Sequence, residues 1–226
     1  MTDQQDASLR TSLSDRVYDA LIDQLMDGVL HPEQQLGIDA LARTLEVSQT
    51  PVREALARLE STGLVRREAL RGYRVAPLST DRELDDLMTA RAVVEPACTW
   101  HATLQAPEAT FDLLATSVEA MRTIPHGPDD HDVRAYWQAD ERFHQLIVDA
   151  ADNGFLRDAH RAMGGTVQRF RLFSERGVTD ADAAVHEHTA VLDAMRRRDA
   201  DGAEEAMRRH LLAVKARARR DRQTLS

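Results

Sequence analysis

Apolar residues recur at helical spacing through nearly all of this 226-residue chain, and this pattern constrains the fold more than any other feature. From about residue 80 to residue 220 they return every three or four positions, and no strand-like alternation follows Val75. Aromatic residues make up only 4%, which disfavours a large β-sandwich. We therefore predict a mainly α-helical protein, and the length slightly favours two domains over one.

The N-terminal part shows a mixed order of elements. Its predicted helices cover about 15–28, 38–45 and 48–62, and its predicted strands cover 64–68 and 73–75. Ser14 and Ser48 are the expected N-caps of the first and third helices. The two β-prone runs flank a turn that contains Gly72, which predicts a hairpin. This order outlines a winged helix-turn-helix, although a small helical domain with an appended hairpin fits the same pattern.

The sequence after the N-terminal part predicts a bundle of helices. The boundary lies at Pro77–Ser79, where Ser79 or Thr80 can cap a long helix. Six helices joined by short turns predict an antiparallel bundle. Their expected ranges are about 80–104, 107–124, 132–151, 155–176, 180–198 and 200–220. We expect a disordered tail over 1–11, one domain over 12–77 and a second domain over 80–222.

Composition and termini exclude several classes of protein. Met1–Leu13 lacks the basic start and apolar middle of a secretory signal, and no apolar run approaches the ~18 residues of a membrane span. The single cysteine, Cys98, rules out an internal disulfide framework and a thiolate zinc site. The net charge of −9 argues against a protein that coats nucleic acid, but it allows a local basic face. We expect a cytoplasmic protein without membrane partners.

Candidate DNA-contacting residues gather on the third helix and the hairpin. The N-terminal residues of a recognition helix face base edges, and glutamine and arginine read adenine and guanine respectively. Between Arg53 and Arg74 there are six arginines against three glutamates. A single arginine is most simply a solvated surface charge, but this clustering favours phosphate contact. The DNA-binding candidates are Ser48, Gln49, Thr50, Arg53, Arg66, Arg67, Arg71 and Gly72.

A possible metal site lies in the helical part. Asp140 and His144 are four residues apart and therefore share one helical face, while His188 and His210 lie on two later helices. Three antiparallel helices can direct these side chains to one interior point. Imidazole and carboxylate suit a divalent ion, Zn first, with Ni, Mn or Fe also compatible. Ordinary core or surface histidines are the alternative. A buried ion with these ligands carries a net positive charge that needs an anionic partner or water.

The sequence around the third helix resembles the GntR family of transcriptional regulators. The resemblance rests on Ser48–Leu56, on Arg58-Leu59-Glu60, and on the hairpin residues Arg71–Val75, and it covers about residues 12–77. It implies a winged helix-turn-helix that binds double-stranded operator DNA. Three positions depart from the usual pattern, because the family often has Gly at Glu33, Arg at Gln49 and a basic residue near Asp39. The usual operator sequence of the family is therefore not assumed.

Residues 80–218 resemble the FCD effector domain of the FadR subfamily. The shared residues include Arg91 and Glu95, the Asp140-x-x-Phe-His144 motif, and the segments around His188 and His210. The resemblance implies that Asp140, His144, His188 and His210 hold a metal ion and that a small organic acid completes its coordination. Arg91 is then a candidate carboxylate clamp, unless it only pairs with Glu95. Asn153 and Arg169 are weaker effector-binding candidates.

Three functional hypotheses remain. The leading one is a homodimeric repressor, not an enzyme, whose operator binding responds to a small carboxylate effector. The alternative is a metal-dependent enzyme of the helical-bundle type, because Glu141 and His144 form one Glu-x-x-His pair, although a second pair is missing. The third is a dimerisation protein with purely structural histidines. Residue patterns leave the effector, the operator and the regulated genes open.

Overall fold

The computed structural model describes residues 12–223 apart from 27, 70, 125–129 and 173–180. The predicted tail over 1–11 lies outside the described residues. The chain divides into two compact units, with the main boundary between Leu78 and Ser79. Helices dominate both units, so the prediction of a mainly α-helical fold is confirmed.

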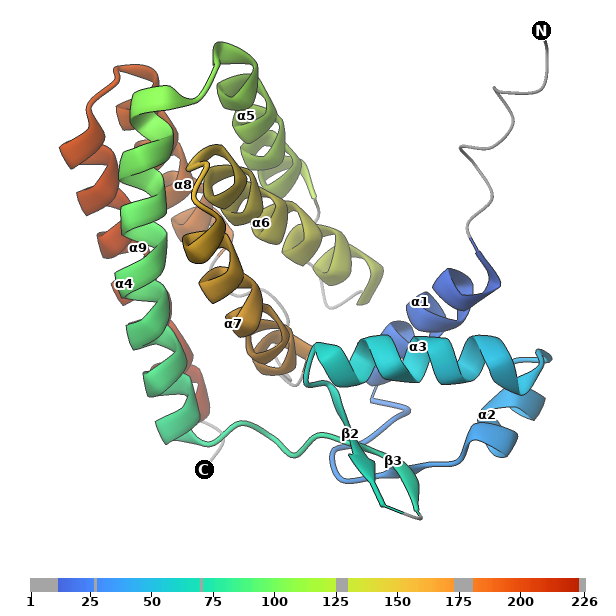
Figure 1. Ribbon diagram of the computed structural model, residues 1–226. Helices are drawn as coiled ribbons and strands as arrows, with labels where there is room; N and C mark the ends of the chain where they lie inside the picture. Colours follow the sequence, from blue (N-terminus) through green and yellow to red (C-terminus); the bar gives the residue numbers. More distant parts are fainter. Residues whose placement is uncertain (1–11, 27, 70, 125–129, 173–180, 224–226) are drawn as a thin grey trace, which may run out of the picture. The chain divides into compact units, whose positions relative to one another are not determined.

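The first unit is a winged helix-turn-helix (Figure 1). Its elements are α1 (Leu13–Met26), β1 (Gln35–Leu36), α2 (Ile38–Thr44), α3 (Gln49–Ser61), β2 (Val65–Glu68) and β3 (Gly72–Val75). The strands form an antiparallel sheet in the order β1–β3–β2. The helices bury apolar side chains at the predicted spacing, among them Leu21, Leu25, Val52, Leu56 and Leu59. This common core places the N-terminal turn of α3 on the surface.

Two local features of this unit differ from the sequence prediction. Helix α1 starts earlier than expected, because Ser12 rather than Ser14 provides its cap. The Ser12 hydroxyl accepts from the Asp15 N–H at 3.1 Å, and the Asp15 carboxylate accepts from the Ser12 N–H at 3.1 Å. Ser48 occupies the N-cap position of α3 as predicted, but its side chain makes no capping hydrogen bond.

Strand β1, which the sequence did not predict, adds a third strand to the wing. Its two residues pair with β3, with Leu36 opposite Tyr73 and Gln35 opposite Arg74. The turn before it contains Glu33 at φ 67°, the left-handed region that glycine adopts without steric cost. The departure from the family's glycine therefore falls at a position where the backbone itself favours glycine.

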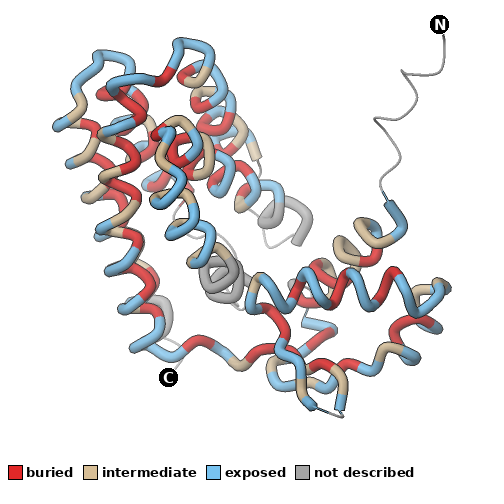
Figure 2. The backbone as a smooth tube through the Cα atoms, viewed as in Figure 1, coloured by how far each residue is buried: buried red, intermediate tan, exposed pale blue. Residues whose placement is uncertain are grey.

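The second unit is a bundle of α-helices. Its elements are α4 (Asp81–Gln105), α5 (Glu108–Thr123), α6 (Asp130–Ala150), α7 (Gly154–Leu172), α8 (Ala181–Arg196) and α9 (Ala200–Gln223). Helix α4 packs on α6 and α9, α5 packs on α6 and α8, and α8 packs on α9. Figure 2 shows buried residues on the inward faces of α4, α5, α6, α8 and α9. Among the described residues, none of the helices combines the length and apolar character needed to cross a bilayer.

Helix α4 begins with a capping box and contains a proline. The Thr80 hydroxyl accepts from the Glu83 N–H, and the Glu83 carboxylate accepts from the Thr80 N–H. Pro96 has no N–H for the carbonyl of Ala92, and that carbonyl accepts from the Arg208 guanidinium of α9 at 3.3 Å. Helix α9 thus satisfies a backbone group that the proline leaves open.

Cys98 lies in the same helix and has no exposed surface. Burial, with a smaller contribution from the negative charge of Glu95, raises the pKa of its thiol to about 11. The thiol therefore stays protonated at neutral pH and packs as a small apolar side chain.

Candidate metal centre and nucleic-acid interface

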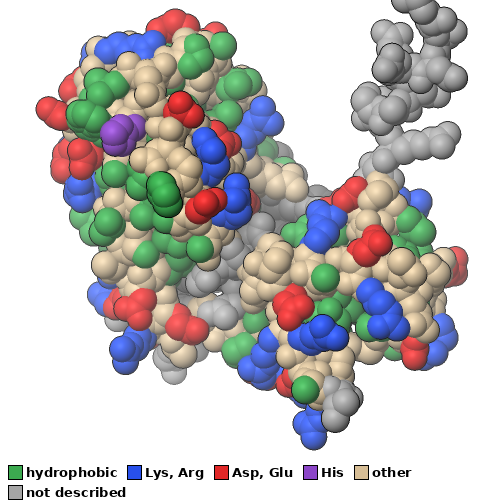
Figure 3. Space-filling view, in the orientation of Figure 1, with side chains coloured by type: hydrophobic (Ala, Val, Ile, Leu, Met, Phe, Trp, Pro, Cys, Tyr) green, Lys and Arg blue, Asp and Glu red, His purple; other side chains and the backbone are tan. Residues whose placement is uncertain are grey.

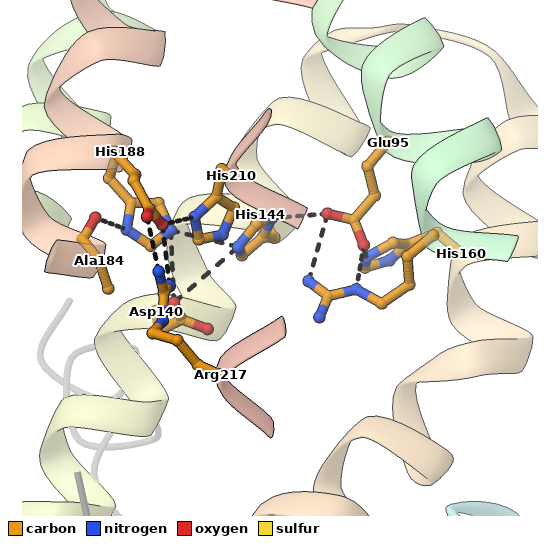
Figure 4. A network of polar contacts seen from close by, with 10 residues as sticks. Glu95, Asp140, His144, His160, Ala184, His188, His210 and Arg217 are labelled. Carbon is orange, nitrogen blue, oxygen red and sulfur yellow. Dashed lines mark hydrogen bonds and ion pairs between the residues drawn. The ribbon is translucent and has the colours of Figure 1, made fainter. Parts of the chain in front are cut away.

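Four predicted ligands converge in the interior of the bundle (Figure 4). Asp140 and His144 come from α6, His188 from α8 and His210 from α9. One candidate ligand atom from each lies within 4.8 Å of the other three, and all four residues are buried. Nε2 of His188 lies 3.2 Å from Nε2 of His144 and 3.3 Å from Oδ1 of Asp140. Such short separations between donor atoms suit a shared cation better than direct contacts among themselves.

The other ring nitrogen of each histidine faces an acceptor outside the cluster. Nδ1 of His188 lies 2.7 Å from the carbonyl oxygen of Ala184, and Nδ1 of His210 lies 2.8 Å from Oε2 of Glu187. Nδ1 of His144 lies 2.7 Å from Oε2 of Glu95. Acceptors at Nδ1 place the proton there and leave Nε2 with its lone pair, which is the usual arrangement behind metal-binding histidines. The donor set therefore fits a divalent ion.

Glu95 connects the cluster to a second buried group. Its Oε1 accepts from Nε of Arg91 at 2.5 Å, and Nε2 of His160 lies 3.8 Å from the same oxygen. Burial alone would raise the pKa of Glu95, but the positive charge of Arg91 and the contact with His144 outweigh burial and hold that pKa well below its usual range. Glu95 is therefore an anion, although only 1% of its surface is exposed.

Glu187 supports the cluster from the opposite side. It accepts two hydrogen bonds from Arg217 of α9, at 2.6 and 2.9 Å, in addition to its contact with His210. Burial raises its pKa, but the hydrogen bonds with His210 and Arg217 prevail and lower the pKa to about 2. Glu187 could not be recognised as a site residue from the sequence, because its partners lie on a different helix.

Two ligands are held in the neutral form that metal binding requires. Burial lowers the pKa of His188 well below its usual value, and the neighbouring His210 lowers it further. Burial also lowers the pKa of His210, against the opposing effect of Glu187. Neutral imidazole is the form that binds a metal ion, so both side chains are ready ligands at neutral pH.

The remaining acids and effector candidates occupy distinct places. Glu141, the acid of the enzyme alternative, is exposed, whereas Asp140 lies in the cluster. Arg91 is buried and pairs with Glu95, the contact that the sequence left open as the alternative to a clamp. Asn153 accepts from the N–H groups of residues 155 and 156 and thereby caps α7. The side chain of Arg169 lies outside the described side chains.

The nucleic-acid candidates lie on the surface of the first unit. Ser48, Gln49, Thr50 and Arg53 are exposed at the start of α3. In the wing, Arg66, Arg67 and Arg71 are exposed and Gly72 is partly exposed. Figure 3 shows arginine side chains on this unit, interspersed with carboxylates.

Several of these polar side chains form hydrogen bonds or ion pairs with neighbouring side chains. Nε2 of Gln49 donates to Asp39 at 2.5 Å, and a guanidinium nitrogen of Arg53 donates to Oε1 of Gln49 at 2.9 Å. Arg66 pairs with Glu33 at 2.6 Å. Arg74, one of the six arginines between residues 53 and 74, pairs with Glu68 at 2.7 Å.

Comparison with known proteins identifies the family. Residues 13–75 match the bacterial regulatory proteins of the gntR family, and residues 86–213 match the FCD domain. The chain is a GntR-family transcriptional regulator with an FCD domain. This combination fits the FadR-like subfamily that the sequence resembles.

Named relatives of this GntR-family regulator extend over most of its length. RspR of Escherichia coli K12, an HTH-type transcriptional repressor, is 25% identical over 93% of this chain and 91% of its own length. A protein of the same strain, named for regulation of the L-lactate dehydrogenase operon, is 33% identical over 89% of this chain and 84% of its own. Both are regulators rather than enzymes, which supports the prediction that this chain is not an enzyme.

Solved structures show the same fold. E. coli McbR/YncC aligns with a TM-score of 0.74 at 20% identity, covering 92% of this chain and 98% of its own. A GntR regulator from Rhodococcus sp. RHA1 aligns with a TM-score of 0.70 at 21% identity and the same coverage.

Proposed function

We propose that this regulator is a homodimeric repressor in the cytoplasm that binds double-stranded operator DNA through residues 12–77. A small carboxylate effector, bound beside a divalent metal ion in residues 80–222, modulates this binding. The observation that carries the proposal is the buried His₃Asp cluster, in which an oxygen atom lies within 2.8 Å of Nδ1 of each histidine. The repressor name of RspR supports the sign of the regulation.

Asp140, His144, His188 and His210 would hold the ion, with Zn favoured and Ni, Mn or Fe compatible. When bound, the ion supplies a net positive charge that attracts a carboxylate. Arg91 is the proposed clamp for the effector, since its guanidinium is buried beside Glu95 and close to the His144 side of the cluster. Asn153 and Arg169 remain weaker proposed contacts. An effector can shift the regulator only through different affinities for its DNA-binding and free forms.

The proposed DNA contacts are those at the exposed start of α3 and in the wing. They comprise Ser48, Gln49, Thr50, Arg53, Arg66, Arg67, Arg71 and Gly72. Two such units in a dimer would match a palindromic operator. The proposed dimer is supported by apolar side chains exposed on the second unit, Val93 and Leu104 of α4 and Leu212 of α9. Figure 3 shows hydrophobic atoms along the visible face of α4.

The test compares substitutions of two histidines in α8. His188 is buried in the cluster, whereas His186 is two residues away and exposed. Purified full-length wild type, His188→Ala and His186→Ala are analysed for bound metal. Each protein is then titrated with DNA from upstream of its own gene at fixed salt, with and without a panel of organic acids.

We expect about one metal ion per chain in wild type and His186→Ala, and loss of the metal in His188→Ala. At least one acid should change operator affinity of the first two proteins and leave the third unaffected. Equal metal content in all three proteins would refute the metal centre. Absence of specific DNA binding by the metal-loaded wild type would refute the regulatory role proposed for the first unit.

A further inference from the structure

The first residues of α3, the proposed recognition helix, take part in a chain of hydrogen bonds. This chain begins at a residue of α2. Asp39 lies in the first turn of α2, and its Oδ1 accepts from Nε2 of Gln49. Oε1 of Gln49 in turn accepts from Arg53, one turn further along α3. All three side chains are exposed on the surface that presents the start of α3.

The chemistry of the end groups fixes the direction of this chain. A carboxylate can only accept hydrogen bonds, and a guanidinium can only donate them. The amide of Gln49 must therefore turn its nitrogen to Asp39 and its oxygen to Arg53. A flipped amide would place its oxygen against the Asp39 carboxylate and its nitrogen against Arg53, which loses both hydrogen bonds.

This orientation changes what each side chain can read. Glutamine recognises adenine by turning its amide oxygen and nitrogen together toward the base edge. In Gln49 these two atoms are directed to Asp39 and Arg53. Arg53 gives one N–H group to Gln49 and keeps the others, and arginine needs two donors for O6 and N7 of guanine.

We propose that Asp39 is a specificity-determining residue that acts through Gln49. It holds the Gln49 amide away from adenine and, through that amide, orients Arg53 toward guanine. The Asp39 carboxylate also opposes the approach of phosphate, which lowers affinity for all DNA alike. This inference rests on the proposed binding of operator DNA by the first unit.

The experiment measures base preference rather than affinity alone. Full-length wild type, Asp39→Ala, Asp39→Asn and Gln49→Ala each select binding sites from a randomised DNA pool at one fixed salt concentration. The asparagine variant removes the charge of Asp39 but keeps an oxygen that accepts from Gln49. The alanine variant removes both the charge and the acceptor. Glu54→Gln serves as a control, because Glu54 is an exposed acid next to Arg53 that lies outside this chain of contacts.

The wild type should select guanine strongly at one position per half-site, with no adenine preference beside it. Asp39→Ala should reduce that discrimination about fivefold or more and gain adenine at the adjacent position. Asp39→Asn should keep the wild-type motif and bind all sequences more tightly. Gln49→Ala should lose guanine discrimination in the same way as Asp39→Ala, but without the gain of adenine.

The outcomes separate this inference from the function on which it rests. The same motif for wild type and Asp39→Ala would overturn the role of Asp39 while leaving operator binding intact. A strong adenine preference in the wild type, absent from Gln49→Ala, would also overturn it. Failure of the wild type to enrich any motif would refute operator binding itself, and the inference with it.

Discussion

At the scale of single residues, Glu95 joins two buried groups. One of its oxygens faces Nδ1 of His144, and the other accepts from Arg91. Its negative charge therefore both orients a candidate metal ligand and balances a buried cation. Removing one member of a buried ion pair leaves the other without compensation, which is more costly than loss of a surface pair.

We expect Glu95→Gln to lower the free energy of unfolding by about 3 kcal/mol or more, because Arg91 stays buried without its counter-charge. Urea denaturation of the chelator-treated protein measures this change. The control is Glu119→Gln, which breaks an exposed pair with Arg122 and should cost less than about 1 kcal/mol. Similar effects of the two substitutions would contradict the ion-pair role of Glu95.

The buried histidines predict a pH dependence of stability. The folded-state pKa values of His188 and His210 lie below those of the unfolded chain, so the unfolded chain binds more protons below pH ~6.5. Stability is therefore full above this pH and falls as the pH decreases. Each histidine contributes a slope of up to about 1.4 kcal/mol per pH unit.

Urea midpoints of the metal-free protein, measured from about pH 7.5 to 5.5, check this slope. His188→Gln should reduce the slope by up to about 1.4 kcal/mol per pH unit, which corresponds to one proton. The control His186→Gln, at an exposed site, should leave the slope unchanged. An unchanged slope in His188→Gln would mean that His188 does not remain neutral in the folded state.

At the scale of elements, the start of α1 offers a test of local capping. Ser12→Ala should destabilise the first unit by about 1 kcal/mol, because the Asp15 N–H loses its acceptor. Ser14→Ala should have a much smaller effect, since the described contact of its hydroxyl is with Ser12. Thermal unfolding followed by circular dichroism compares the two variants, and the reverse order would restore Ser14 as the cap.

The types and order of the helices were predictable because apolar spacing repeats over many turns and averages out local ambiguity. Strand β1 was not, since two residues cannot show an alternation. Its position depends on a tertiary contact, that of Leu36 with Tyr73. The same limit applies to caps, where two nearby serines are equally good candidates until the backbone selects one.

The candidate site was predictable to a different extent. Spacing placed Asp140 and His144 on one helical face, and three antiparallel helices allowed His188 and His210 to join them. Family resemblance then favoured these four residues over the alternative of ordinary core or surface histidines. Glu95 and Glu187, which lie next to Nδ1 of His144 and His210, were not predicted to support the metal ligands. Glu187 precedes His188 in sequence, but its contacts are with His210 and Arg217 on α9. Only the packing of α8 on α9 brings these residues together.

At the scale of the whole molecule, the two units should respond differently to metal. Both tryptophans, Trp100 and Trp137, lie in the second unit, so their fluorescence reports on that unit alone. Metal that binds only the folded state stabilises it, by about 2.7 kcal/mol at 100 times the dissociation constant. We expect chelation to lower the unfolding temperature seen by tryptophan fluorescence in the wild type but not in His188→Ala.

Circular dichroism of the same samples includes the first unit. A circular dichroism transition that is absent from tryptophan fluorescence belongs to the first unit. The unfolding temperature of that transition should not change after chelation. A chelator that leaves the wild-type fluorescence transition unchanged would contradict a stabilising metal in the second unit.

The complete burial of Cys98 makes the native chain suitable for site-specific dye attachment. Maleimide reagents need an accessible thiolate, and this thiol is both enclosed and protonated. In a Glu60→Cys variant, the new thiol on the exposed end of α3 would react selectively without removal of the native cysteine. Energy transfer between two such dyes could then follow the separation of paired recognition helices as effector is added.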